Sequence, residues 1–222
     1  YEMSASLVGS EMCIRDRKMI DKVNQHWQAE NSPEVRSFWD NAVYHTGNME
    51  AYFLTGNETY RTYSETWANY NQWKGAKSDN RAEWKYSYGE SDEYVLFGDY
   101  QICFQTYTDL YNLAPDDKKI KRAREVMEYQ MSTPQHDYWW WSDALYMAMP
   151  VMTKLYKVTH NAKYLDKLYE YLIYSDSIMF DKDENLYYRD AKYIYPKHKT
   201  VNGKKDFWAR GDAVSYTHLT LP

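Results

Sequence analysis

The chain has 222 residues, enough for one domain with a buried core or for part of a larger one. Its net charge of −5 offers no basic surface for nucleic acid, and no apolar run approaches the ~18–20 residues of a membrane span. Two cysteines make neither a disulfide framework nor a metal-ligand pattern. Aromatic residues form 18% of the chain, which is typical of a fold lined with amphipathic rings.

The two ends differ in composition from the rest of the chain. Residues 4–17 and 215–222 resemble translated sequencing adapters rather than the aromatic, helix-patterned sequence between them. We therefore expect artefactual tails at 1–17 and 215–222, with 18–214 an internal piece of a longer protein. No signal peptide is recognisable. Because we expect the true N-terminus to be missing, the sequence does not distinguish a periplasmic from a cytoplasmic location, and it does not indicate an oligomeric state.

Hydrophobic periodicity predicts an all-α fold. The expected helices, in chain order, are 18–30, 38–54, 57–74, 98–113, 117–131, 142–158 and 161–178. Two irregular regions remain, 75–97 and 181–207. In the second, alternating residues at 186–189 and 193–195 indicate a short β-ribbon, and a connection of this length in a helical protein is more often functional than idle.

Similar turn sequences recur between these helices. They lie at 55–57, 114–117 and 159–161, each after an aromatic, apolar helix and before a more polar one. This repeat predicts stacked helical hairpins, which either close into a toroid or extend as a solenoid.

The most informative local feature is a run of three tryptophans, 139–141, followed closely by Asp143. Indole faces suit the apolar C–H face of a sugar ring. A carboxylic acid against such a wall is partly desolvated, which favours its protonated form and general-acid chemistry. The simpler alternative is that Ser142 or Asp143 caps a helix N-terminus.

Asp99 is a second candidate, because it also precedes an apolar helix, after Gly98. If the hairpins form a toroid, Asp99 and Asp143 lie at equivalent ends of alternate hairpins and meet at one rim. Like-charge repulsion would then keep one of the pair protonated. Helix capping is again the simpler alternative.

Three further positions are candidates for substrate binding. Arg210 follows Trp208, so that the guanidinium would pin a carboxylate while the indole stacks on the sugar; a surface pair between Arg210 and Asp212 is the alternative. Arg189 lies on the irregular segment, and the alternative for it is again a surface ion pair. His45, after Tyr44, is the third candidate, although a lone histidine within a helix is more often a core residue. No phosphate loop, serine triad or zinc-protease spacing occurs.

Three motifs together resemble glycoside hydrolase families 88 and 105, the unsaturated glucuronyl and rhamnogalacturonyl hydrolases, with family 105 the closer. They are Gly-Asp-Tyr-Gln at 98–101, Trp-Trp-Trp-Ser-Asp-Ala-Leu-Tyr-Met-Ala-Met-Pro at 139–150 and Phe-Trp-Ala-Arg-Gly-Asp at 207–212. The likeness covers about 35–214. It implies an (α/α)6 barrel of which this chain holds about the first seven helices, truncated at the C-terminal side.

The resemblance also implies an activity: removal of a terminal 4,5-unsaturated uronic acid from lyase-generated oligosaccharides by hydration of the vinyl ether. No metal or cofactor is expected. Asp143 corresponds to the general acid and Asp99 to the aspartate that orients substrate and tunes the pair. The substrate-binding residues that it implies are Trp141, Trp208, Arg210, Arg189, Tyr44 and His45.

The chain departs from the family pattern in two places. Many members have histidine where Arg189 stands, and the family pattern continues beyond Val214, where the adapter-like tail begins. The fragment itself is therefore expected to be inactive. Two rival functions remain: an N-acylglucosamine 2-epimerase-like isomerase on the same toroid, which needs a histidine pair, and a non-catalytic carbohydrate-binding protein of stacked hairpins, which has no need of Asp143.

Overall fold

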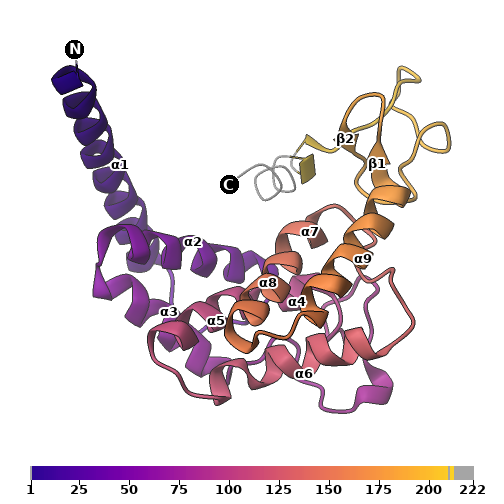
Figure 1. The fold of residues 1–222 in the computed structure, drawn as a ribbon, viewed down its shortest axis with the longest axis horizontal. Coiled ribbons are helices and arrows are strands. Elements are labelled where there is room, and N and C mark those ends of the chain that lie inside the picture. Colours follow the sequence, from indigo (N-terminus) through magenta and orange to yellow (C-terminus); the bar gives the residue numbers. More distant parts are fainter. Residues whose placement is uncertain (1, 210, 213–222) are drawn as a thin grey trace.

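The computed structural model describes the backbone of residues 2–209 and 211–212, and the side chains from residue 15 onward in that range. The described chain is mostly helical, which confirms the predicted class (Figure 1). Its helices are α1 (Glu2–Glu30), α2 (Trp39–Thr55), α3 (Glu58–Tyr70), the 3-10 turn η1 (Arg81–Glu83), α4 (Gly98–Gln101), α5 (Cys103–Leu113), α6 (Lys118–Ser132), α7 (Asp143–Met147), α8 (Met149–Thr159) and α9 (Lys163–Met179).

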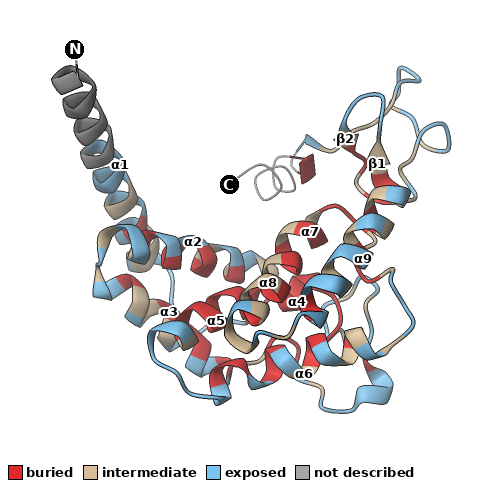
Figure 2. Cartoon of the chain, in the orientation of Figure 1, coloured by how far each residue is buried: buried red, intermediate tan, exposed pale blue. Residues whose placement is uncertain are grey.

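The main helices form two rows. Helices α2, α5 and α8 lie side by side, and each packs against the helix that follows it, α3, α6 or α9. The first row is the more buried: every residue of α5 from Cys103 to Leu110 is buried, because neighbours cover it on several sides (Figure 2). Consecutive hairpins in two rows are the arrangement expected of a helical toroid.

The predicted turns between paired helices are confirmed, and they share local chemistry. Gly56 and His160 both adopt the left-handed conformation, with φ of 71° and 56°, and end α2 and α8. Asn57 and Asn161 then each accept a hydrogen bond from a backbone N–H at the start of the next helix. Asp116 does the same before α6. Such side-chain caps satisfy donors that the first turn leaves open.

The predicted helix 142–158 is interrupted at Ala148, which separates α7 from α8. Pro150 explains the interruption, because proline has no N–H to donate to the carbonyl one turn earlier and its ring crowds that carbonyl. The freed carbonyls of Tyr146 and Met147 instead accept hydrogen bonds from Gln105 Nε2 at 2.8 and 3.0 Å. A buried amide on α5 thus stabilises the break that places α7 separately from α8.

Replacing Gln105 with methionine is expected to lower the free energy of unfolding by about 1–3 kcal/mol, because one buried and one partly buried carbonyl lose their donor. Urea denaturation followed by circular dichroism measures this loss. Gln135→Met is the matched control, since Gln135 is exposed. An equal loss in both variants would contradict the role given to Gln105.

The irregular segment 181–207 begins with a short ribbon that differs from the predicted one. Strand β1 (Phe180–Asp181) pairs antiparallel with β2 (Leu186–Tyr187), while 193–195 forms no strand. The chain reverses early because Asp181 Oδ1 accepts the backbone N–H groups of Asp183 and Glu184, and Asn185 adopts a positive φ of 56°. The prediction was therefore right for 186–187 and wrong for the partner.

The backbone does not test the expected tail at 1–17. Helix α1 continues without a break from Glu2 to Glu30 and projects away from α2 and α3 (Figure 1). The other expected tail, 215–222, lies outside the described residues. Within the part of the chain that is described, none of the helices combines the length and the apolar character needed to cross a bilayer.

Candidate active site

A cavity of about 520 Å³ lies where the N-terminal ends of α2, α4 and α7 meet. Trp39 begins α2, Asp99 is the second residue of α4, and Asp143 is the first of α7. The fold therefore brings the two predicted carboxylates to one rim. The rest of the lining is aromatic and charged: Tyr88, Phe97, Trp140, Trp141, Met147, Arg189, Asp190, Lys192 and Trp208.

The two carboxylates interact electrostatically. Burial, and then the charge of Asp143, raise the pKa of Asp99 from 3.8 to about 7. Capping does not account for these positions, since Phe97 and Ser142 occupy the N-cap sites and neither side chain makes a capping hydrogen bond. Because coupled carboxylates titrate as a pair, the site retains one proton up to about pH 7.

The tryptophan run divides between the core and the cavity. Trp139 is 1% exposed and packs against Tyr171 with ring centroids 5.3 Å apart, so it belongs to the core. Trp141 lines the cavity and packs on Phe97 at 4.5 Å. Trp140, which was not among the predicted substrate-binding residues, also lines the cavity. Its indole is oriented by a 2.9 Å hydrogen bond from Nε1 to the carbonyl of Tyr86.

Gly98 allows Trp141 to approach the start of α4. A Cβ at this position would lie 3.3 Å from Cη2 of the Trp141 indole, closer than most side chains tolerate. The glycine before Asp99 thus has a packing reason, since it lets the indole close one side of the cavity next to the carboxylate.

The segment after β2 completes another side of the cavity. The backbone N–H of Ser142 donates to the carbonyl of Arg189 at 2.9 Å, and Trp141 and Asp190 form an isolated antiparallel bridge. The Arg189 guanidinium pairs with Asp190 at 2.8 Å and lies 3.8 Å from the centre of the Tyr193 ring. The irregular region therefore places the Arg189 guanidinium in the cavity lining, next to the loop that carries Asp143.

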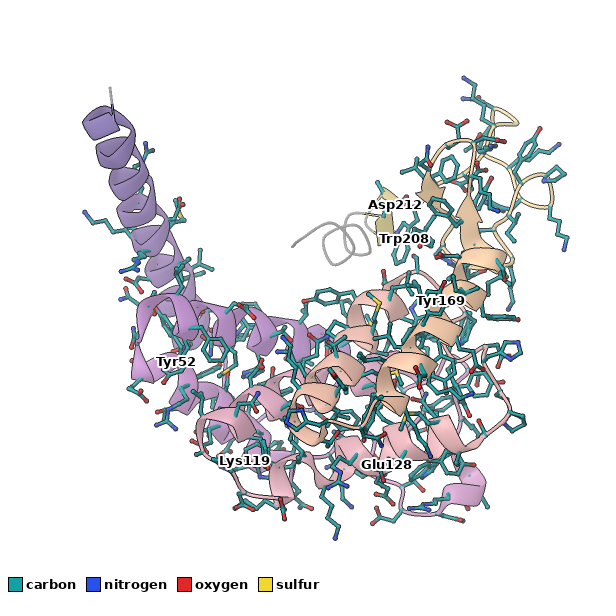
Figure 3. All side chains as sticks on the ribbon, in the orientation of Figure 1. Tyr52, Lys119, Glu128, Tyr169, Trp208 and Asp212 are labelled. Atoms are coloured by element: carbon teal, nitrogen blue, oxygen red, sulfur yellow. The ribbon has the colours of Figure 1, made fainter. Side chains whose placement is uncertain are left out.

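The third motif lies beside the ribbon (Figure 3). Trp208 lines the cavity, and Asp212, one helical turn later, is buried and accepts a 2.6 Å hydrogen bond from the backbone N–H of Tyr187. Asp212 is therefore not a surface residue, and its carboxylate anchors the segment to β2. Gly211 lies close to Trp208, since a Cβ there would come within 2.6 Å of the indole. Arg210 lies outside the described residues.

Tyr44 and His45 do not line this cavity, which corrects the expectation that they contact substrate. His45 is 2% exposed and stacks on Trp67 at 4.0 Å between α2 and α3, with its Nδ1 3.0 Å from Ser64 Oγ. Burial lowers its pKa to about 3. Tyr44 stacks on Trp27 of α1 at 4.6 Å. The simpler alternative of a core histidine is the correct one.

Several cavity residues were not predicted from the sequence. Trp39, Tyr88 and Lys192 come from a helix start and two irregular segments, where no local motif marks them. The only sequence signal was indirect, the unusual length of 181–207. Among the described residues, no three histidine, cysteine, aspartate or glutamate side chains gather in a way that would hold a metal ion.

The family profile of Glycosyl Hydrolase Family 88 matches residues 14–220. The chain belongs to this family. Two curated relatives are each named unsaturated 3S-rhamnoglycuronyl hydrolase. The one from Formosa agariphila is 28% identical over 187 residues, 78% of this chain and 47% of the relative. The one from an Alteromonas species is 34% identical over 83 residues, 37% of this chain and 20% of the relative.

Solved structures agree with the fold of this family 88 chain. A family 88 glycosyl hydrolase from Bacteroides vulgatus is 64% identical with a TM-score of 0.90, and covers 93% of this chain. A protein described as a polysaccharide lyase is 67% identical with a TM-score of 0.91, and covers 94%. This chain spans 59% of each solved chain and about half of the Formosa relative.

The extent of the family match bears on the two terminal segments. It includes residues 14–17 and 215–220, which were expected to be artefactual. The comparisons therefore give no support to the adapter interpretation of these stretches.

Proposed function

We propose that the protein releases a terminal 4,5-unsaturated uronic acid from oligosaccharides by hydrating the vinyl ether double bond. The observation that carries the proposal is the carboxylate pair, Asp99 and Asp143, in one aromatic cavity, with the pKa of Asp99 raised to about 7. A pair that keeps a proton near neutrality suits an acid-catalysed reaction. Family membership and the names of the curated relatives support the same reaction.

The chemistry requires one proton donor that later becomes a base. The carboxylic acid of Asp143 gives its proton to C4, and the electrons of the C4=C5 double bond form the new C–H bond. Water adds to the resulting oxocarbenium carbon C5 and returns a proton to the Asp143 carboxylate. The hemiketal at C5 then opens, and collapse of the exposed hemiacetal at C1 releases the remaining sugar.

The two carboxylates are assigned different roles because their exposure differs. Asp143 is half-buried, whereas Asp99 is 6% exposed. Asp143 therefore reaches substrate more readily. Asp99 helps the carboxylate pair to retain its proton and orients the sugar ring. We assign Trp141 and Trp208 to stacking on the sugar and, from the motif alone, Arg210 to its oxygens or carboxylate.

The rival functions lack specific support. An epimerase-like isomerase needs a histidine pair, and the described cavity lining contains no histidine. A non-catalytic binding protein has no use for a carboxylate with a pKa near 7. A lyase, the description of one solved relative, runs in the opposite chemical sense, because it removes the C5 proton, breaks the C4–O bond and creates the alkene.

The sign of an absorbance change separates these functions. The product of the complete gene is incubated with an unsaturated uronyl–rhamnose disaccharide, and separately with the uncut polysaccharide. Ultraviolet absorbance of the conjugated alkene is expected to fall with the disaccharide and stay constant with the polysaccharide. A rise with the polysaccharide would establish a lyase, and no change with this or a glycosaminoglycan-derived disaccharide would favour a binding protein.

Lys192→Met is expected to raise KM for the unsaturated disaccharide about 10-fold with little change in kcat. The Lys192 side chain lines the cavity, and a hydrogen bond to a charged group contributes roughly 1.5–3 kcal/mol. Steady-state kinetics measure the effect, with Lys197→Met, exposed and absent from the cavity lining, as the control. An unchanged KM would show that Lys192 makes no such hydrogen bond to the substrate.

A further inference from the structure

A second cavity, of about 770 Å³, adjoins the first. Both cavities are lined by the side chains of Tyr88, Trp140, Asp190 and Lys192. The second is otherwise formed by Trp84, Lys85, Tyr86, Ser87, Asp137 and Ala191. Most of these residues come from the irregular region 75–97, whose function the proposed reaction leaves unassigned. The two cavities thus share these four walls, and Asp99 and Asp143 line only the first.

The aromatic walls of the second cavity are held in place before any ligand binds. Trp140 Nε1 donates to the carbonyl of Tyr86 at 2.9 Å. The Tyr86 hydroxyl donates to Asp137, 3.2 Å from each carboxylate oxygen, and its ring packs edge-on against Tyr138 at 4.9 Å. A wall that is already ordered loses little conformational entropy on binding, which favours affinity.

The composition of this wall fits a sugar better than an apolar ligand. Rings from Trp84, Tyr86 and Trp140 are combined with charged groups at the edge, among them Asp137 and Lys192. A pyranose presents the same combination, an apolar C–H face with hydroxyl groups around it. Lys192 makes no ion pair with any described residue, whereas the neighbouring Arg189 pairs with Asp190.

We infer that the second cavity binds the sugar units that lie beyond the terminal disaccharide, so that the enzyme acts on oligosaccharides longer than a disaccharide in preference to the disaccharide. The inference rests on the proposed function. Its basis is continuity: Trp140 and Tyr88 are shared walls, and a chain whose terminal ring lies beside Asp143 extends into the adjoining space. Tyr88, 68% exposed, stands at the junction.

The test fills the second cavity without altering the first. Ser87 is exposed and lines only the second cavity, so Ser87→Trp blocks it; Ser177→Trp, an exposed serine on α9, is the matched control. kcat/KM is measured with the unsaturated uronyl–rhamnose disaccharide and the corresponding tetrasaccharide. We expect the wild-type enzyme to prefer the tetrasaccharide about 10-fold, and Ser87→Trp to abolish this preference while the disaccharide rate is unchanged.

A binding measurement separates failure of the inference from failure of the proposed reaction. Calorimetry with the tetrasaccharide, on an Asp143→Asn background that does not turn it over, is expected to show about 10-fold weaker binding when Ser87→Trp is added. Equal rates for both substrates with no effect of the block would overturn the inference and leave the reaction intact. Absence of turnover with binding still sensitive to Ser87→Trp would overturn the reaction alone, and binding insensitive to the block would overturn the inference.

Discussion

Asp143→Asn is expected to lower kcat by about 1,000-fold or more with KM changed only a few-fold, because the amide has the shape of the acid but no proton to give to C4. The side chain lines the cavity at the first residue of α7. Steady-state kinetics of alkene loss measure the effect in the product of the complete gene.

The control for this variant is Asp183→Asn, whose carboxylate is 91% exposed and absent from the cavity lining. Circular dichroism should show the same helical content in both variants. Activity that survives Asp143→Asn while Asp99→Asn is inactive would exchange the two roles, and activity that survives in both would remove the pair from the reaction.

Asp99→Asn is expected to make the protein more stable above pH 7 and less active. The folded chain holds the Asp99 proton to about pH 7, whereas the unfolded chain releases it near its ordinary pKa of 3.8. The folded state therefore binds more protons between about pH 4 and pH 7, and the free energy of unfolding falls as pH rises through that window. Asparagine does not titrate, so the variant avoids this loss of unfolding free energy. The loss is on the order of 4 kcal/mol, because each unit of pKa difference corresponds to about 1.4 kcal/mol.

Urea denaturation across this pH range measures the predicted gain. Asp109→Asn is the contrasting control, because Asp109 is also buried with a raised pKa but pairs with Lys154. Removing that charge takes away the partner of a lysine and is expected to destabilise the protein. Equal pH slopes for wild type and Asp99→Asn would contradict the raised pKa.

The same variant tests the coupling in the reaction. Since the charge of Asp143 helps to hold the proton on Asp99, the pair loses its proton at a higher pH than one isolated carboxylate would. In Asp99→Asn the alkaline limb of kcat/KM against pH is therefore expected to move to lower pH. A limb that stays in place would show that Asp99 does not help to retain the catalytic proton.

Features with local causes were predictable from the sequence. The turns at Gly56 and His160 are recognisable because a left-handed residue followed by a capping asparagine is a local signal. The interruption after α7 was not predicted, although Pro150 within the expected helix is a sequence signal for such a break. The motifs also located Asp99, Asp143, Trp141 and Trp208, which the fold brings to one cavity.

Features that depend on tertiary packing were not predictable in the same way. His45 and Arg189 are both polar residues near aromatic ones, yet one is buried against Trp67 and the other lines the cavity. Arg189 reaches the cavity because the irregular segment is held there by the hydrogen bond from the Ser142 N–H to the Arg189 carbonyl. The local sequence does not show this long-range contact. Lys192 and Tyr88 reach the cavity by the same kind of long-range placement.

We propose that the double bond, and not the anomeric carbon, is the point of attack. Proton nuclear magnetic resonance of the unsaturated disaccharide during turnover measures both events at once, the loss of the vinyl C4 proton and the release of the second sugar. Hydration predicts that one vinyl signal disappears for each sugar released, with the same rate constant, and that Asp143→Asn stops both. Release of a sugar that still carries its vinyl proton would contradict the proposed reaction.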